Sequence, residues 1–231
     1  MKAVIFTLLV SLLSTSYTAF AVTSKTDIKS DLSEAELKTV NSGEFVIKME
    51  DVKGSPWPEI TYYALIDSTP LESIGLFAAY DIQKDYIPNI LKSMVTKSIS
   101  PTDIITEYVL HLPFPLSNAR YTHGARLYKF DDDFVLTWYM VESTSSEEVR
   151  GHVYFTSTNG KTLMRYRTYV KPKSMLGSFV KNAMLKDVKA TMIAIKNFIE
   201  KNKREQSAIN SKYSEFITRA LRGEFVYQTN N

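Results

Sequence analysis

The chain contains no cysteine among its 231 residues. This absence excludes disulfide bonds, thiolate metal ligands and cysteine nucleophiles. Three motifs of common enzyme classes are missing as well: the phosphate loop, the G-x-G-x-x-G dinucleotide fingerprint and the G-x-S-x-G nucleophile elbow. The sequence therefore carries no familiar signature of catalysis, and packing of the core must hold the fold together without covalent cross-links.

A strong excess of charge is also missing. The chain has 28 Lys and Arg against 25 Asp and Glu, which gives a formal net charge of +3. A protein that binds nucleic acid needs a clustered basic face. The near-neutral balance therefore argues against a nucleic-acid partner.

Residues that could ligate a metal ion are few. His111, His123 and His152 lie on three different predicted strands, without the short-range spacing of zinc ligands. The acidic run 131–133 lacks the loop pattern and the terminal glutamate of a calcium site, and it fits a solvated turn. We therefore expect neither a metal ion nor another cofactor.

The first 21 residues have the pattern of a secretory signal peptide. Lys2 precedes an apolar run, residues 3–13, and the stretch ends in the A-x-A site Ala19-Phe20-Ala21. The apolar run is too short to span a bilayer as a retained anchor. We expect an exported protein, periplasmic or secreted, whose mature chain of about 210 residues is long enough for one sizeable domain.

The chain's longest amphipathic stretch covers residues 174–203. It has no internal proline, and lysines occupy most of the side opposite its apolar face. The small residues Ala183, Ala190 and Ala194 would let another element approach closely. We predict one long helix that lies on the strands preceding it. Its apolar positions, spaced by three and four residues, are Val180, Met184, Val188, Met192, Ile195 and Ile199.

The remaining segments predict an α+β domain with a mostly antiparallel sheet. Residues 22–32 are rich in Ser, Thr, Lys and Asp and are expected to be flexible. A capping box at 33–36 predicts a short first helix, and Thr69-Pro70 predicts the start of a second. Residues 82–87 are expected to be helical or irregular, and 204–221 to be a further helix. The predicted strands are 44–52, 59–67, 91–98, 103–112, 119–129, 134–142, 148–156 and 162–170.

This order of elements resembles the helix-grip fold of the START lipid-transfer family, within the wider polyketide-cyclase-like superfamily. The similarity covers residues 33–203, and its most specific part is 103–128. The matching positions there are Glu107 on a strand, a loop with Pro113 and Pro115, and the arginines Arg120 and Arg126. The aspartate that follows the loop arginine in the family is replaced by Tyr121.

The resemblance implies a curved sheet around the long helix, with an interior tunnel for a lipid or another hydrophobic molecule. A carboxylate–arginine pair inside the tunnel occurs in several members, and Glu107 with Arg126 would be that pair here. A charge inside a sheet is tolerated only when it is paired with an opposite charge or hydrated. The alternative is that the two residues form an exposed cross-strand pair or are two unrelated solvated charges. The expected ligand-binding residues are Glu107, Arg126, Trp138, Tyr166, Met184, Val188 and Met192.

The leading hypothesis is a non-enzymatic carrier that opens at one rim, at 113–117 or 174–177. One alternative is a cyclase or hydrolase of the same superfamily, with Glu107 or a histidine as general acid or base. The other is an interaction module, in which the apolar side of the C-terminal extension 204–231 docks a partner or a second copy. Transient contact of the lysine-rich helix face with an anionic membrane is a weaker alternative.

Overall fold

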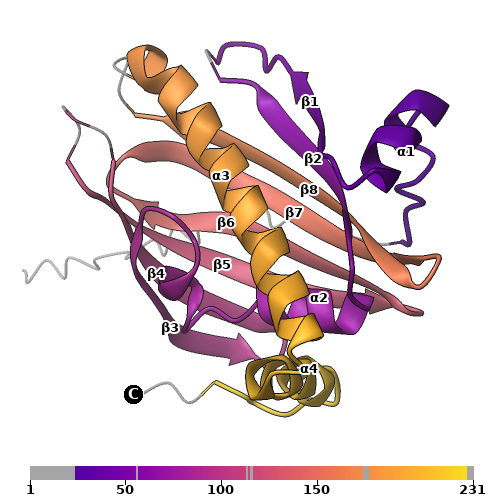
Figure 1. Ribbon diagram of the computed structural model, residues 1–231. Coiled ribbons are helices and arrows are strands. Elements are labelled where there is room, and N and C mark those ends of the chain that lie inside the picture. Colours follow the sequence, from indigo (N-terminus) through magenta and orange to yellow (C-terminus); the bar gives the residue numbers. More distant parts are fainter. Residues whose placement is uncertain (1–23, 56, 113, 115–116, 174–176, 228–231) are drawn as a thin grey trace, which may run out of the picture.

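The computed structural model describes residues 24–55, 57–112, 114, 117–173 and 177–227. The signal-peptide prediction lies outside these residues. The described strands form one antiparallel sheet in the order β1-β2-β8-β7-β6-β5-β4-β3. The sheet is strongly curved, and the helices α2, α3 and α4 lie on its concave side (Figure 1). The predicted α+β helix-grip architecture is therefore confirmed.

The strands begin and end within two residues of their predicted bounds. The turn between β7 and β8 is an example of a strand end that a local signal predicts. Asn159 and Gly160 both adopt positive φ angles there, as a tight hairpin requires. The strands are β1 (Val46–Glu50), β2 (Glu59–Ile66), β3 (Ile90–Ser100), β4 (Asp103–Leu110), β5 (Ala119–Phe130), β6 (Asp133–Ser143), β7 (Ser146–Thr158) and β8 (Lys161–Pro172).

Two helices start at the predicted capping boxes. Ser33 caps α1 (Glu34–Asn41), and Thr69 caps α2 (Pro70–Phe77) with a proline in its first turn. In each case the hydroxyl accepts from the backbone N–H of a glutamate, Glu36 or Glu72, whose carboxylate accepts from the cap residue's own N–H. The single-turn helix η1 (Gln83–Asp85) follows α2 within the segment expected to be helical or irregular.

The long helix α3 (Gly177–Arg204) crosses the concave face of the sheet. Its apolar side is buried at Met192, Ile195 and Ile199, as the spacing predicted. The carboxylate of Glu200 accepts from the backbone N–H of Asp67 at 3.0 Å, which fixes the last turns of α3 to the end of β2. None of the described helices is long and apolar enough to cross a membrane.

The N-terminal segment 22–32 was expected to be flexible, but its described part, residues 24–32, packs against the domain. Residues 24–32 lie on the convex side of the sheet, where Ile28 is fully buried and Leu32 is 6% exposed. Asp31 accepts hydrogen bonds from Tyr63 at 3.0 Å and from Arg165 at 2.6 Å. Two apolar side chains and one carboxylate therefore attach this polar segment to a second, outer core.

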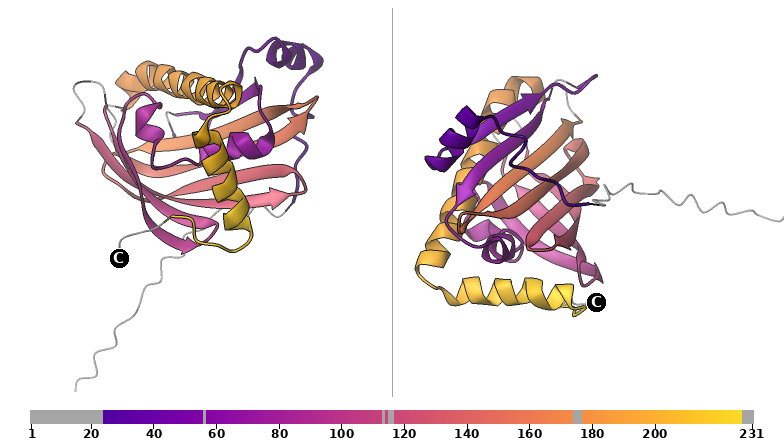
Figure 2. Two further views of the ribbon diagram at one scale, coloured as in Figure 1. Left: turned by 60° about the horizontal axis from the view of Figure 1, so that its bottom comes forward. Right: turned by 90° about the vertical axis from the view of Figure 1, so that its right-hand side faces the viewer.

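Helix α4 (Ala208–Leu221) runs across the end of the domain, next to α2 (Figure 2). On its predicted apolar side Tyr213 and Ile217 are buried in the main core, 1% and 7% exposed, whereas Ile209 is 41% exposed. Gly75 of α2 permits this close contact, because a Cβ atom there would lie 2.9 Å from the backbone nitrogen of Ser214. The described part of the extension, residues 204–227, is therefore part of the domain, and the buried part of its apolar side is not a free docking surface for a partner.

Candidate ligand cavity

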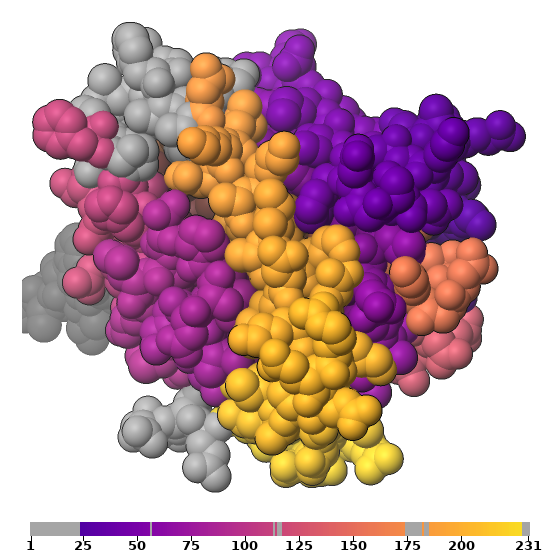
Figure 3. Space-filling view, in the orientation of Figure 1, coloured from indigo at the N-terminus to yellow at the C-terminus, as the bar shows by residue number. Residues whose placement is uncertain are grey.

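A cavity of about 770 Å³ lies between the concave face of the sheet and α3. Its volume falls within the range of sites for small molecules, roughly 300–1,000 Å³. The space-filling view shows the molecule hollowed beside the upper part of α3 (Figure 3). Nearer the C-terminal end of α3, Ile199 is fully buried in the main core.

One wall of the cavity is aromatic. Trp138 of β6 stacks on Tyr166 of β8 with ring centroids 5.1 Å apart, and Phe77 at the end of α2 lies 6.3 Å from the Tyr166 ring. Gly151 lies opposite Trp138 on the neighbouring strand, so the indole rests on backbone that carries no side chain. This arrangement makes that wall of the cavity broad and apolar.

Helix α3 supplies the opposite wall through Val188, Thr191, Met192 and Ile195. Four of the residues predicted to bind a ligand therefore lie in the cavity wall: Trp138, Tyr166, Val188 and Met192. Their contact with a ligand stays a prediction. Met184 is on α3, but its side chain lies outside the described part of the structure.

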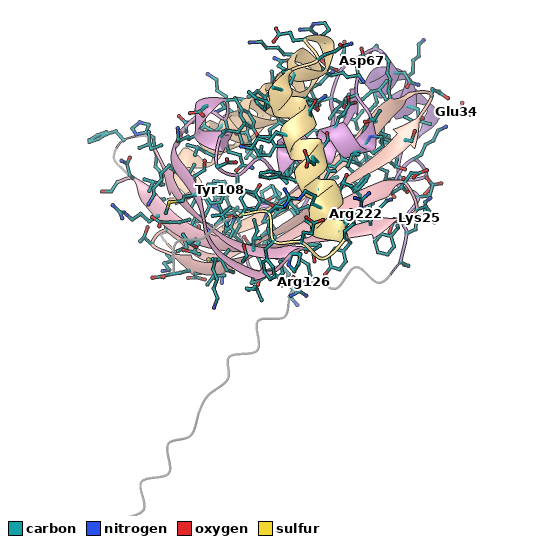
Figure 4. The ribbon with its side chains drawn as sticks, turned by 90° about the horizontal axis from the view of Figure 1, so that it is seen from below. Lys25, Glu34, Asp67, Tyr108, Arg126 and Arg222 are labelled. Carbon is teal, nitrogen blue, oxygen red and sulfur yellow. The ribbon has the colours of Figure 1, made fainter. Side chains whose placement is uncertain are left out.

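The predicted inward-facing pair of Glu107 and Arg126 is wrong. On β4 the side chains of Thr106 and Tyr108 line the cavity, so Glu107 points to the convex face, where Lys92 donates to it at 3.0 Å. Arg126 likewise lies on the outer side of β5 (Figure 4) and donates from Nε to Asp103 at 2.9 Å. The strand register places Arg126 opposite Asp103 rather than Glu107.

The polar residues of the interior are ones that the sequence reasoning did not single out for a ligand. Thr106 and His123 are register partners on β4 and β5, and Tyr80, in the segment after α2, also lines the cavity. Tyr108 donates to the side-chain oxygen of Gln83 at 2.7 Å, and the Gln83 amide donates to the Phe77 carbonyl at 2.8 Å. Counting every second strand residue from His123, rather than from Glu107, would have identified the residues that face the cavity.

Burial keeps the interior uncharged. It lowers the pKa of His123 to about 3, so the imidazole is neutral at physiological pH. It also raises the pKa of Tyr166 to about 12. The Nε2 atom of His123 is fully buried and has no hydrogen-bond partner among the described residues.

The buried histidine predicts a loss of stability in acid. The folded-state pKa of His123 lies below its unfolded value, so its contribution is complete above about pH 6.5 and decreases as the pH falls toward 3. At pH 5 the loss in the free energy of unfolding, relative to neutral pH, reaches up to about 2 kcal/mol. Urea unfolding of the protein and of His123→Gln at pH 7.5 and pH 5 should show a smaller acid loss in the variant. Equal losses in both proteins would contradict this reading.

The mouth of the cavity is polar and lies at the ends of the strands. His111, Asn118 and Lys173 belong to its rim, and the ring nitrogen Nδ1 of His111 is 3.2 Å from the side-chain oxygen of Asn118. Residues 113, 115–116 and 174–176 of the two predicted rim elements lie outside the described part of the chain. Ser117 and Lys173, which flank them, do border the mouth. Among the described residues, no group of three potential ligands could hold a metal ion.

Neither a protein-family model nor a curated protein matches this sequence. Comparison of the fold with solved structures does find similar proteins. The STAR-related lipid transfer protein from Xanthomonas axonopodis superposes with a TM-score of 0.61 at 13% identity, over 67% of this chain and 93% of the other. Human StAR-related lipid transfer protein 5 gives 0.60 at 8% identity, over 69% and 83%.

The chain has a START-like helix-grip fold. The same START-like fold also includes an enzyme, the Zhui aromatase/cyclase from a Streptomyces species, with a TM-score of 0.54, 9% identity and coverage of 62% of this chain and 94% of that one. The START-like neighbours therefore establish the architecture around the cavity. What the cavity binds has to be argued from its own residues.

Proposed function

We propose that this protein binds a hydrophobic small molecule, a lipid in the broad sense, in the cavity between the sheet and α3, and carries it without chemical change. The observation that carries the proposal is the cavity of about 770 Å³ with its wall of Trp138, Tyr166 and Val188. Each square ångström of apolar ligand surface removed from water contributes roughly 25 cal/mol to binding. The lipid-transfer proteins among the structural neighbours support the same class of ligand.

A catalytic role has less support from the site. Glu107, the carboxylate considered as a general acid or base, lies on the convex face and pairs with Lys92. Among the described residues that line the cavity, the one carboxylate is Asp187, a half-buried residue of α3. General acid–base chemistry needs a proton-transferring group within hydrogen-bond reach of the reacting atom. Binding and transport therefore account for the interior better than turnover does.

The proposal includes export and exchange of the ligand at the polar mouth. The signal-peptide pattern of residues 1–21 supports export. Phe114, in the loop between β4 and β5, is 94% exposed, and the basic residues Arg120 and Lys173 border the mouth of the cavity. An exposed aromatic side chain beside basic ones favours brief contact with an anionic membrane during exchange.

Filling the cavity tests the proposal. Val188→Trp should place an indole in the cavity and reduce copurifying hydrophobic ligand at least about fivefold, because the larger side chain takes up space that the ligand would otherwise fill. Organic extraction followed by mass spectrometry measures the ligand. The matched control is Ile193→Trp, on the outward side of the same helix, where the side chain is 39% exposed. The proposal would be contradicted if Val188→Trp kept the same ligand content, or if the unaltered protein copurified with no hydrophobic ligand.

A further inference from the structure

A second, smaller cavity lies beyond the inner end of the ligand cavity. It measures about 30 Å³ and lies between α4 and the sheet, where Tyr213 and Ile217 border it. Sites for small molecules measure roughly 300–1,000 Å³, so this space does not hold a ligand of its own. Its importance depends on whether it continues the larger cavity.

The inward-facing residues of the strands show that it does. On β4 Tyr108 and Thr106 line the ligand cavity, and the next inward-facing residue, Ile104, lines the second cavity. On β5 Ala125 borders both spaces, six residues along the strand from Ala119 at the mouth. A strand rises about 3.3 Å per residue, so the second cavity begins about 20 Å from the mouth.

The ring of Tyr80 separates the two spaces. Three of the described residues border both of them: Tyr80, Ala125 and Leu136. Ala125 and Leu136 belong to strands and form part of the sheet wall. Tyr80, which is 5% exposed, comes from the segment after α2, on the concave side of that wall. Its side chain is therefore the one that closes the passage between the cavities.

Side chains of α4 and of the segment after it hold this ring in place. The Tyr80 ring lies 6.1 Å from the ring of Tyr227, whose hydroxyl donates to the backbone oxygen of Ala78 at 2.7 Å. Tyr227 also packs edge-on against Phe216 of α4, with ring centroids 5.8 Å apart. Both side chains border the second cavity, so they limit rotation of the Tyr80 ring away from a ligand.

The charges of the lining indicate which end of an amphiphile lies inside. The basic residues of the described lining, Arg120 and Lys173, are exposed and border the mouth, whereas Ala125 and Leu136 form the inner wall. A charged head group at that depth would lose its water without gaining an opposite charge, which proteins strongly disfavour. The head of an amphiphilic ligand therefore stays at the mouth, and its apolar chain points toward Tyr80.

We propose, on the basis of the function proposed above, that the ligand is an amphiphile bound with its apolar chain inward, and that Tyr80 sets the longest chain that the cavity accepts. Each methylene removed from water tightens binding about fourfold, equivalent to about 0.8 kcal/mol. Affinity should therefore rise with chain length until the end of the chain reaches Tyr80, and then stop rising. Replacing the ring by a small side chain joins the second cavity to the first and makes room for a longer chain.

The test measures binding of saturated fatty acids with eight to eighteen carbons. The protein is loaded with the uncharged dye Nile red and titrated at pH 8 with each acid below its micelle concentration, and loss of dye fluorescence reports displacement. In the unaltered protein the affinity should rise with chain length and then level off. In Tyr80→Ala the rise should continue for about two more carbons, so that the longest acids bind at least about tenfold more tightly than to the unaltered protein.

Ile217→Ala is the matched control. Ile217 is 7% exposed and lines the second cavity but not the first, so its truncation enlarges the space beyond Tyr80 and also costs stability. With the Tyr80 ring in place, this variant should keep the chain-length limit of the unaltered protein. Added to Tyr80→Ala, the same truncation should raise the limit further.

Two milder variants cover the case in which Tyr80→Ala does not fold. Tyr80→Phe keeps the aromatic ring and should keep the chain-length limit. Tyr80→Leu replaces the ring by a smaller apolar side chain and should accept longer chains than Tyr80→Phe does.

The outcomes separate the two proposals. The role of Tyr80 would be overturned by an equal limit in Tyr80→Leu and Tyr80→Phe, by a higher limit in Ile217→Ala alone, or by an affinity that rises through all eighteen carbons in the unaltered protein. Binding of Nile red without displacement by any acid would also overturn it, but would leave the hydrophobic carrier standing. Failure of Nile red and of every acid to bind would overturn both proposals.

Discussion

Tyr213→Ala should lower the free energy of unfolding by about 3–5 kcal/mol, as removal of a large buried aromatic side chain does. The Tyr213 side chain is 1% exposed and lies between α4 and the core. Its hydroxyl also donates to Asp81 at 2.6 Å, which joins α4 to the segment after α2. Urea unfolding monitored by circular dichroism measures the loss.

Two further variants separate packing from other causes. Tyr213→Phe keeps the ring and removes the bond to Asp81, so it should cost about 1.5–3 kcal/mol, the usual contribution of a hydrogen bond to a charged group. Ile209→Ala is on the same helix at a 41% exposed position and should change stability by less than about 1 kcal/mol. If Tyr213→Ala were as mild as Ile209→Ala, α4 would not be a structural part of the domain.

Gly151→Ala should destabilise the sheet by about 3 kcal/mol, the upper end of the cost of overpacking. A Cβ atom at Gly151 would lie 2.3 Å from Cζ2 of Trp138 and 2.5 Å from the backbone oxygen of Arg167. The indole could move only into the cavity, and the carbonyl belongs to the sheet. Thermal unfolding measures the stability, and Nile red fluorescence should fall with it because Trp138 enters the ligand space.

Gly124→Ala is the comparison for this substitution. The three atoms nearest to its Cβ atom would all belong to the side chain of Tyr139, on the convex face of the sheet. Tyr139→Ala should therefore restore part of the stability lost in Gly124→Ala, whereas Trp138→Ala should restore less in Gly151→Ala because the Arg167 carbonyl remains in contact. Equal rescue at both sites would contradict the role given to the backbone at Gly151.

The positions of the helices and strands could be predicted because their signals are local. The Ser33 and Thr69 caps bond to groups three residues away, and Asn159-Gly160 forms its turn alone. The buried stripe of α3 follows from spacing within one helix. None of these interactions needs knowledge of the rest of the chain.

The prediction about Glu107 and Arg126 went wrong for a reason visible in β4. Ile104, Thr106 and Tyr108 face inward, while Ile105 and Val109 flank Glu107 on the outer face. Both sides of the strand are partly apolar, so a period of two does not reveal which side faces the cavity. Only the pairing with β5 and the direction of curvature decide it.

By itself the sequence determined the order, type and limits of the elements, since capping, turn and periodicity signals act within a few residues. The helix-grip architecture was implied by the resemblance of that order to the START family. The tertiary structure decided that the charged pair faces outward, that Thr106 and His123 face the cavity, and that α4 and residues 24–32 belong to the two cores. These features depend on sheet curvature and on contacts between residues far apart in the chain, and such contacts leave no periodic trace in the sequence.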